Sequence, residues 1–307
     1  MQQRSKSHDS TRATAAATLT ILVAALSACG GSGSTSGGTP TATVTAIVVN
    51  ATKYASTATI TINGTGLDST LAVSSPVCTG MTLQSGNTST SATYSCTVSG
   101  GLTGSVIADS NGTQVGSATL TVPAPIVRLA VNNGLSAVGN IDVTLAPQNA
   151  PKTVDNFLQY VNTGWYDNTI FHRVVSNFIM QGGGYAPQIT SVASATPKTG
   201  TFAPIAVEAT GLSNTAGTIA MANANNPPTV DSITTTSQFF FNLADNRTNL
   251  GPYYAVFGTI TAGSSVVTAI VTASQTSPSS CVANTAANTT DCLPIPNVVV
   301  TSATQIQ

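Results

Sequence analysis

The sequence predicts a mainly β protein, in which a small β-sandwich precedes a larger β-barrel or sandwich closed by two short helices. Short runs of alternating apolar and polar residues recur along the chain, and this period of two is typical of half-buried strands. Only 6% of the 307 residues are charged, a composition that suits β-rich exported proteins. The Pro123-Ala124-Pro125 segment marks the domain boundary, because a proline restricts its own backbone and that of the preceding residue.

Length and charge limit the class of protein further. The chain is long enough for two domains once a targeting segment is removed, and 41% hydrophobic residues allow a packed core. The formal net charge is −1, so the sequence offers no basic patch and we expect no nucleic-acid partner.

The first 28 residues indicate a signal peptide. Arg4, Lys6 and Arg12 form a basic region before an apolar stretch at 15–26. That stretch is too short to span a bilayer, so a signal peptide is favoured over a transmembrane helix.

The apolar stretch ends in Leu26-Ser27-Ala28-Cys29, which resembles the bacterial lipobox. The resemblance implies cleavage before Cys29, acylation of Cys29 and anchoring to a membrane. Gly30 follows, with no aspartate retention signal, which implies the periplasmic side of the outer membrane. An ordinary signal peptide with a chance cysteine is the alternative.

Residues 29–40 are rich in Gly, Ser and Thr and predict a flexible linker. Residues 41–124 predict the β-sandwich, with alternation at 59–62, 93–98 and 117–122 and a turn at Asn63-Gly64. This domain resembles bacterial immunoglobulin-like modules. It shows no catalytic constellation, so we expect a spacer or partner-binding role.

Residues 125–307 predict the second domain. Pro151 suits the first turn of a helix whose apolar face carries Val154, Phe157, Leu158 and Val161 and which Gly164 ends. A second short helix is expected at 266–271. Strands are expected at 127–131, 141–145, 169–175, 178–181, 217–221, 238–242 and 254–260.

The segment from Phe171 to Gly183, FHRVVSNFIMQGG, resembles the signature of the cyclophilins. Three further blocks agree in order: 139–157, 217–224, and 237–240 running on to Val256-Phe257-Gly258. The resemblance covers 126–273. It implies an eight-stranded antiparallel barrel capped by two helices and a peptidyl-prolyl cis-trans isomerase that acts on proline-containing polypeptides without cofactor or metal. The segment 279–296 is expected to lie beyond this core.

The resemblance assigns the catalytic position to Arg173 and its orienting partner to Gln181. This suits the chemistry, because rotation about an X–Pro bond crosses a barrier of about 18–20 kcal/mol. In the twisted state the prolyl nitrogen regains a lone pair, which a permanently charged guanidinium can stabilise. His172 is expected to be structural.

The remaining family positions form the substrate site. An apolar cup for the proline ring is expected from Phe178, Ile179, Phe240 and Leu250, and Tyr254 is a further substrate-binding position. A segment of small side chains would bind the residues before proline and allow an extended peptide to approach the backbone: Ala222, Asn223 and Ala224.

Four further cysteines allow three pairings. Export favours disulfides, and the local pairs Cys78–Cys96 and Cys281–Cys292 need the least assumption because each lies within one domain. A metal site is the weaker alternative, since no C-x-x-C motif is present.

A second function of a different class stays open. The low charge and the Thr/Ser-rich surface also suit a non-catalytic chaperone or adhesion module that binds proline-containing peptides.

Overall fold

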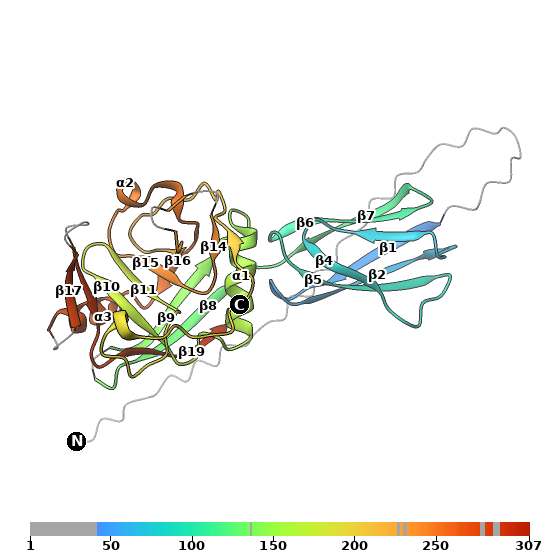
Figure 1. Cartoon of the computed structure of the whole chain (residues 1–307). Coiled ribbons are helices and arrows are strands. Elements are labelled where there is room, and N and C mark those ends of the chain that lie inside the picture. The colour runs from blue at the N-terminus through green and yellow to red at the C-terminus, as the bar shows by residue number, and fades with distance from the viewer. Residues whose placement is uncertain (1–41, 136, 226–227, 230–231, 277–279, 285–288) are drawn as a thin grey trace, which may run out of the picture.

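A computed structural model of the protein describes residues 42–135, 137–225, 228–229, 232–276, 280–284 and 289–307. They form two β domains in chain order, and the smaller lies beside helix α1 (Pro151–Asn162) of the larger (Figure 1). The predicted signal peptide (1–28), Cys29 and the predicted linker (29–40) lie outside the described residues. In the described ranges, no helix has the length and apolar character needed to cross a bilayer.

The N-terminal domain is a sandwich of two antiparallel sheets. Buried side chains from both sheets, among them Ile60, Tyr94 and Val106, fill the space between them. The first sheet has the order β1-β2-β5-β4 and the second β3-β6-β7. The strands are β1 (Thr43–Asn50), β2 (Thr57–Thr65), β3 (Leu71–Ser74), β4 (Cys78–Leu83), β5 (Ser91–Val98), β6 (Thr103–Ser110) and β7 (Thr113–Thr121).

Asn63 and Gly64 lie inside β2, so the turn predicted there is wrong. Asn63 pairs with Ser91 of β5, and the chain turns only at Gly66, whose φ is +67°. A Cβ on Gly64 would lie 2.0 Å from the Thr43 carbonyl oxygen. The glycine therefore permits the close approach of β1, and pairing on both sides of β2 extends the strand through the expected turn.

The second domain contains a closed barrel of eight antiparallel strands, which confirms the predicted fold. The barrel order is β11-β15-β13-β16-β9-β8-β19-β10, and β10 pairs with β11 to close it. The strands are β8 (Ile126–Asn132), β9 (Val138–Leu145), β10 (Thr169–Val175), β11 (Ile179–Gly182), β13 (Thr218–Met221), β15 (Phe239–Asn242), β16 (Val256–Ala262) and β19 (Val298–Gln305).

Helices α1 and α3 (Ser264–Thr276) cap the barrel. Pro151 occupies the first turn of α1, and the predicted face of Val154, Phe157, Leu158 and Val161 is buried. The shorter elements are η1 (Val192–Ser194), β12 (Ile205–Ala206), β14 (Ile233–Thr235), α2 (Arg247–Leu250) and η2 (Gly251–Tyr253).

The segment beyond residue 273 contributes to the barrel. Strand β19, which was not predicted, pairs with β8 on one side and β10 on the other. Before it, β17 (Ser280–Asn284) and β18 (Thr289–Leu293) form a hairpin, in which Cys292 pairs with Val174 of β10. The expectation that 279–296 stands apart from the core is therefore wrong for this hairpin. Strand pairing with β10 was not visible in the local pattern.

Two disulfides join neighbouring strands. Cys78–Cys96 links β4 to β5, and Cys281–Cys292 links β17 to β18. Both are the local pairs expected from the sequence.

Tyr54 connects the two domains. Its side chain is fully buried; the hydroxyl donates a 2.6 Å hydrogen bond to Oδ1 of Asp155 on α1 and accepts one from the Gly100 N–H at 2.9 Å. Its carbonyl accepts a hydrogen bond from Nε2 of Gln305 on β19. Contacts to both α1 and β19 attach the sandwich directly to the barrel.

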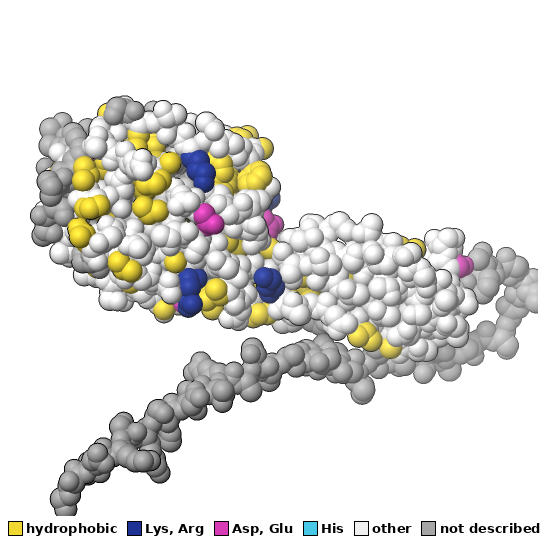
Figure 2. All heavy atoms as spheres, turned by 90° about the horizontal axis from the view of Figure 1, so that it is seen from below, with side chains coloured by type: hydrophobic (Ala, Val, Ile, Leu, Met, Phe, Trp, Pro, Cys, Tyr) yellow, Lys and Arg dark blue, Asp and Glu magenta, His cyan; other side chains and the backbone are white. Residues whose placement is uncertain are grey.

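The surface follows from the composition. In Figure 2, the Lys, Arg, Asp and Glu side chains on the visible face are few and scattered among polar and apolar atoms. No charged patch is seen on this face.

Candidate active site

A row of paired residues crosses the barrel wall at β10. Arg173 lies opposite Gln181 on β11, and Gln181 lies opposite Phe240 on β15. Directly opposed residues of antiparallel strands project from the same face of a sheet. The next residues on β10 and β11, Val174 and Met180, are buried in the main core, whereas the Arg173 side chain is 27% exposed. This alternation places the row on the outer face of the barrel.

An apolar cluster surrounds Phe240 on this outer face and is separate from the main core. The Tyr254 ring packs edge-on against the Phe240 ring, with 5.4 Å between centroids. The cluster contains six of the predicted substrate residues, together with Ala220 and Val256: Phe178, Ile179, Ala222, Phe240, Leu250 and Tyr254. Side chains from four strands and α2 thus form one apolar site beside Gln181.

Two polar contacts hold the side chains of Gln181 and Arg173 in the row. Nε2 of Gln181 donates to Oε1 of Gln238 at 2.9 Å. Arg173 donates from Nε and Nη2 to the two carboxylate oxygens of Asp291 on β18, at 2.8 and 3.2 Å. Neither Gln238 nor Asp291 was among the predicted site residues. Gln238 could have been found from its position in the conspicuous SQFFF block, whereas Asp291 carried no such signal.

The Tyr254 hydroxyl lies within the electrostatic reach of Arg173. Burial raises the pKa of Tyr254, and the positive charge of Arg173 partly opposes this rise. Arg173 and the apolar cluster therefore face a common region.

The predicted peptide-binding segment is fixed by its own loop. The Asn223 carboxamide donates to the carbonyls of Thr229 and Tyr253, and its oxygen accepts from Thr234 at 2.8 Å. Ala224 is exposed and donates its N–H to Thr234. The Asn223 side chain is thus engaged in holding the loop.

His172 is buried, with its ring 4.7 Å from that of Tyr185 between centroids. Burial, with a smaller effect of the Arg173 charge, lowers its pKa from 6.5 to about 4. The imidazole is therefore neutral near pH 7.

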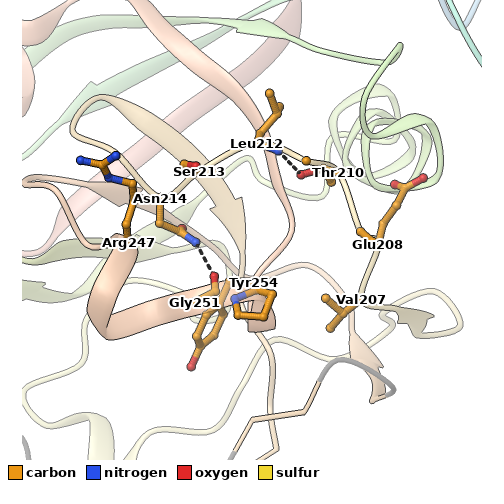
Figure 3. Close-up of a pocket in the computed structure, with 12 residues that line it drawn as sticks. Val207, Glu208, Thr210, Leu212, Ser213, Asn214, Arg247, Gly251 and Tyr254 are labelled. Carbon is orange, nitrogen blue, oxygen red and sulfur yellow. Dashed lines mark hydrogen bonds between the residues drawn. The ribbon is translucent and has the colours of Figure 1, made fainter.

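A cavity of about 560 Å³ adjoins the apolar cluster (Figure 3). Tyr254 lines it and also belongs to the cluster, whereas Arg173 does not line it. Its walls come mainly from residues 207–214 and from the α2–η2 segment, where Asn214 donates to the Gly251 carbonyl. Apart from Tyr254, the cavity contains none of the predicted site residues.

Comparison with known proteins concerns the second domain. Residues 126–302 match the family model described as "Cyclophilin type peptidyl-prolyl cis-trans isomerase/CLD". The chain is 45% identical over 143 residues to "Peptidyl-prolyl cis-trans isomerase cyp18" of Streptomyces antibioticus, covering 44% of this chain and 79% of that protein. It is 40% identical over 137 residues to "Peptidyl-prolyl cis-trans isomerase B" of Escherichia coli, covering 42% and 76%.

A solved structure of a cyclophilin-type isomerase from Cryptosporidium parvum, in the presence of the dipeptide Ala-Pro, is also similar. It shares 23% sequence identity at a TM-score of 0.43, over 59% of this chain and 99% of that chain.

Proposed function

The chain belongs to the cyclophilin-type peptidyl-prolyl cis-trans isomerases, and on that basis we propose that Arg173 is the catalytic donor with which it isomerises X–Pro bonds of exported proteins. The observation that carries the proposal is the outer-face row of Arg173, Gln181 and Phe240. It combines one fixed cation with an apolar site on adjacent strands.

The reaction needs no bond to be made or broken. Amide resonance opposes rotation, so the enzyme must bind the twisted amide more tightly than either planar form. In the twisted form the prolyl nitrogen becomes pyramidal and gains a lone pair. A guanidinium N–H directed at that nitrogen stabilises the twisted form selectively, and each 1.4 kcal/mol of selective stabilisation gives about a tenfold rate increase.

The roles of the other residues follow from their positions. The apolar cluster around Phe240 would hold the proline ring and so direct the preceding amide toward Arg173. Gln181 lies between the two, where its carboxamide oxygen is available to the peptide backbone or the guanidinium. The 222–224 segment would accept the residues before proline through its main chain, because the Asn223 carboxamide is already engaged.

Turnover and binding can be separated experimentally. The purified full chain should accelerate cis-to-trans conversion of a proline-containing tetrapeptide in a protease-coupled assay. Arg173→Ala should abolish most of the acceleration while peptide binding, measured by calorimetry, persists. Binding by the wild type without any acceleration would instead favour the non-catalytic chaperone or adhesion module.

We further propose that the protein is a lipoprotein anchored through Cys29. The basic region, apolar stretch and Leu26–Cys29 motif support this proposal. In cells fed a labelled fatty acid, the wild type should carry the label and Cys29→Ser should not. Labelling of the Cys29→Ser variant would contradict the anchor, and recovery of the wild type in the inner membrane would contradict outer-membrane delivery.

The N-terminal sandwich would then act as a spacer between membrane and barrel. Its direct attachment through Tyr54 supports a fixed spacer. Its relationship to bacterial immunoglobulin-like modules remains part of this proposal.

A further inference from the structure

The guanidinium of Arg173 is held by a carboxylate from outside the row described above. Asp291 lies on β18, 118 residues further along the chain, and accepts from Nε at 2.8 Å and Nη2 at 3.2 Å. The two side chains are 27% and 25% exposed. Such two-point contacts fix the plane of a guanidinium as well as its position.

Strand pairing determines the direction from which Asp291 approaches. Cys292 pairs with Val174, so its neighbour Asp291 projects from the same outer face as Arg173. Strand β18 lies on one side of β10, whereas β11 and the apolar cluster around Phe240 lie on the other. Asp291 therefore extends the row by one strand and binds Arg173 from the side away from the proposed proline site.

The donor inventory of arginine shows what this contact leaves available. A guanidinium has five N–H bonds. The contact with Asp291 occupies two of them, the N–H of Nε and one N–H of Nη2. Both N–H bonds of Nη1 and the second of Nη2 are not used by this ion pair. The carboxylate can orient the guanidinium while donors remain for a substrate amide.

We propose that Asp291 is a positioning residue for Arg173, delivered by the disulfide-closed hairpin β17–β18. The proposal rests on the catalytic role of Arg173 proposed above. Approach from the side opposite the apolar cluster favours positioning over inhibition, because an inhibitory carboxylate would have to occupy the place of the peptide.

The test compares Asp291→Ala and Asp291→Asn with the wild type in the full chain. A pre-oriented donor matters in the transition state, so Asp291→Ala should lower kcat roughly tenfold and leave KM nearly unchanged. Asp291→Asn can still accept one hydrogen bond from Arg173, so its kcat should lie between those of the wild type and Asp291→Ala. The Arg173 Nε–H resonance should exchange faster with water in Asp291→Ala.

Asp142→Ala is the matched control. Asp142 accepts from Nε and Nη2 of Arg128 with the same two-point geometry, on β8 and β9, which carry no residue of the row. It should leave kcat within about twofold, whatever its effect on the melting temperature. Equal losses of kcat in Asp142→Ala and Asp291→Ala would show a merely structural role and overturn the proposal.

A double variant separates this proposal from the one on which it rests. If Asp291 acts through Arg173, adding Asp291→Ala to Arg173→Ala should change kcat no further. Activity that survives Arg173→Ala would refute the catalytic role of Arg173 itself. Loss of activity in Arg173→Ala with wild-type or higher activity in Asp291→Ala would refute only the positioning role.

Discussion

Gln181 donates a hydrogen bond from Nε2 to Oε1 of Gln238 at 2.9 Å, and the two side chains come from β11 and from the residue just before β15. This hydrogen bond engages the side-chain NH2 group of Gln181 with Gln238. The side-chain oxygen of Gln181, Oε1, is then left as a hydrogen-bond acceptor within the outer-face row. Gln238 thereby extends the site beyond the residues that the sequence motif identified.

Gln238→Ala should lower kcat/KM severalfold, because Gln181 would lose the contact that orients its carboxamide. The same substitution in a Gln181→Ala background should have little further effect. Steady-state assays of the two single variants and the double variant measure this coupling. Additive losses would mean that Gln238 acts independently of Gln181.

Arg173→Ala should lower kcat/KM by roughly a hundredfold or more, since a preorganised charged donor is lost. Arg173→Lys keeps the charge but loses the planar fork, so it should recover only part of the activity. The protease-coupled proline-peptide assay measures both. Arg128→Ala removes a β8 arginine paired with Asp142 and should leave activity unchanged.

His172 should make stability depend on pH. Its native pKa is lowered from 6.5 to about 4, so the unfolded chain takes up a proton at a higher pH than the folded chain. The stabilisation is present above pH 6.5 and is lost as the pH falls toward 4, by roughly 3 kcal/mol in total. Denaturant unfolding of wild type and His172→Gln at pH 7 and pH 4.5 measures it. Identical losses in both proteins would contradict the assignment.

Tyr54→Phe should destabilise the barrel although Tyr54 belongs to the sandwich. The substitution leaves a partly buried Asp155 oxygen and the Gly100 N–H without the tyrosine hydroxyl, at a cost of about 1–3 kcal/mol. Trp165, the single tryptophan, lies in the barrel domain and reports its unfolding by fluorescence.

Tyr94→Phe is the control for Tyr54→Phe, because the Tyr94 hydroxyl donates to the Leu71 carbonyl within the sandwich itself. It should leave the Trp165 transition in place. Equal shifts of the Trp165 unfolding transition in the two variants would show that the Tyr54–Asp155 hydrogen bond does not couple the stability of the two domains.

Replacing Cys281 and Cys292 by serine should lower kcat by less than Asp291→Ala does. The disulfide restrains the hairpin, but the pairing of residue 292 with Val174 persists. The double serine variant of Cys78 and Cys96 should leave kcat unchanged while destabilising the sandwich by about 2–4 kcal/mol. A larger kcat effect from the sandwich pair would contradict this picture.

Prediction from sequence was most successful where the determining contacts are local or lie within a recognisable motif. The α1 face of Val154 and Phe157 follows from helical spacing alone. The association of Phe178 and Ile179 with Phe240 followed from the motif resemblance. The Asn63-Gly64 turn was wrong because the close approach of β1 overrides a local turn preference.

The features that escaped prediction depend on distant partners. Asp291 meets Arg173 across 118 residues, and β19 finds β8 and β10 at the opposite end of the domain sequence. No period in the sequence encodes which strand a segment will join. The contact of Asp291 with Arg173 and the place of β19 in the barrel could therefore be recognised only from the sheet order of the structure.

The position of β19 has a consequence for biogenesis. Residues 298–305 fill the gap between the first barrel strand and β10, so the ring of main-chain hydrogen bonds stays open until they arrive. Until residues 298–305 have been synthesised, β8 and β10 therefore each keep an unpaired edge, and such edges are prone to aggregation. Folding of the barrel would therefore depend on protection of these two edges until the last strand has been made.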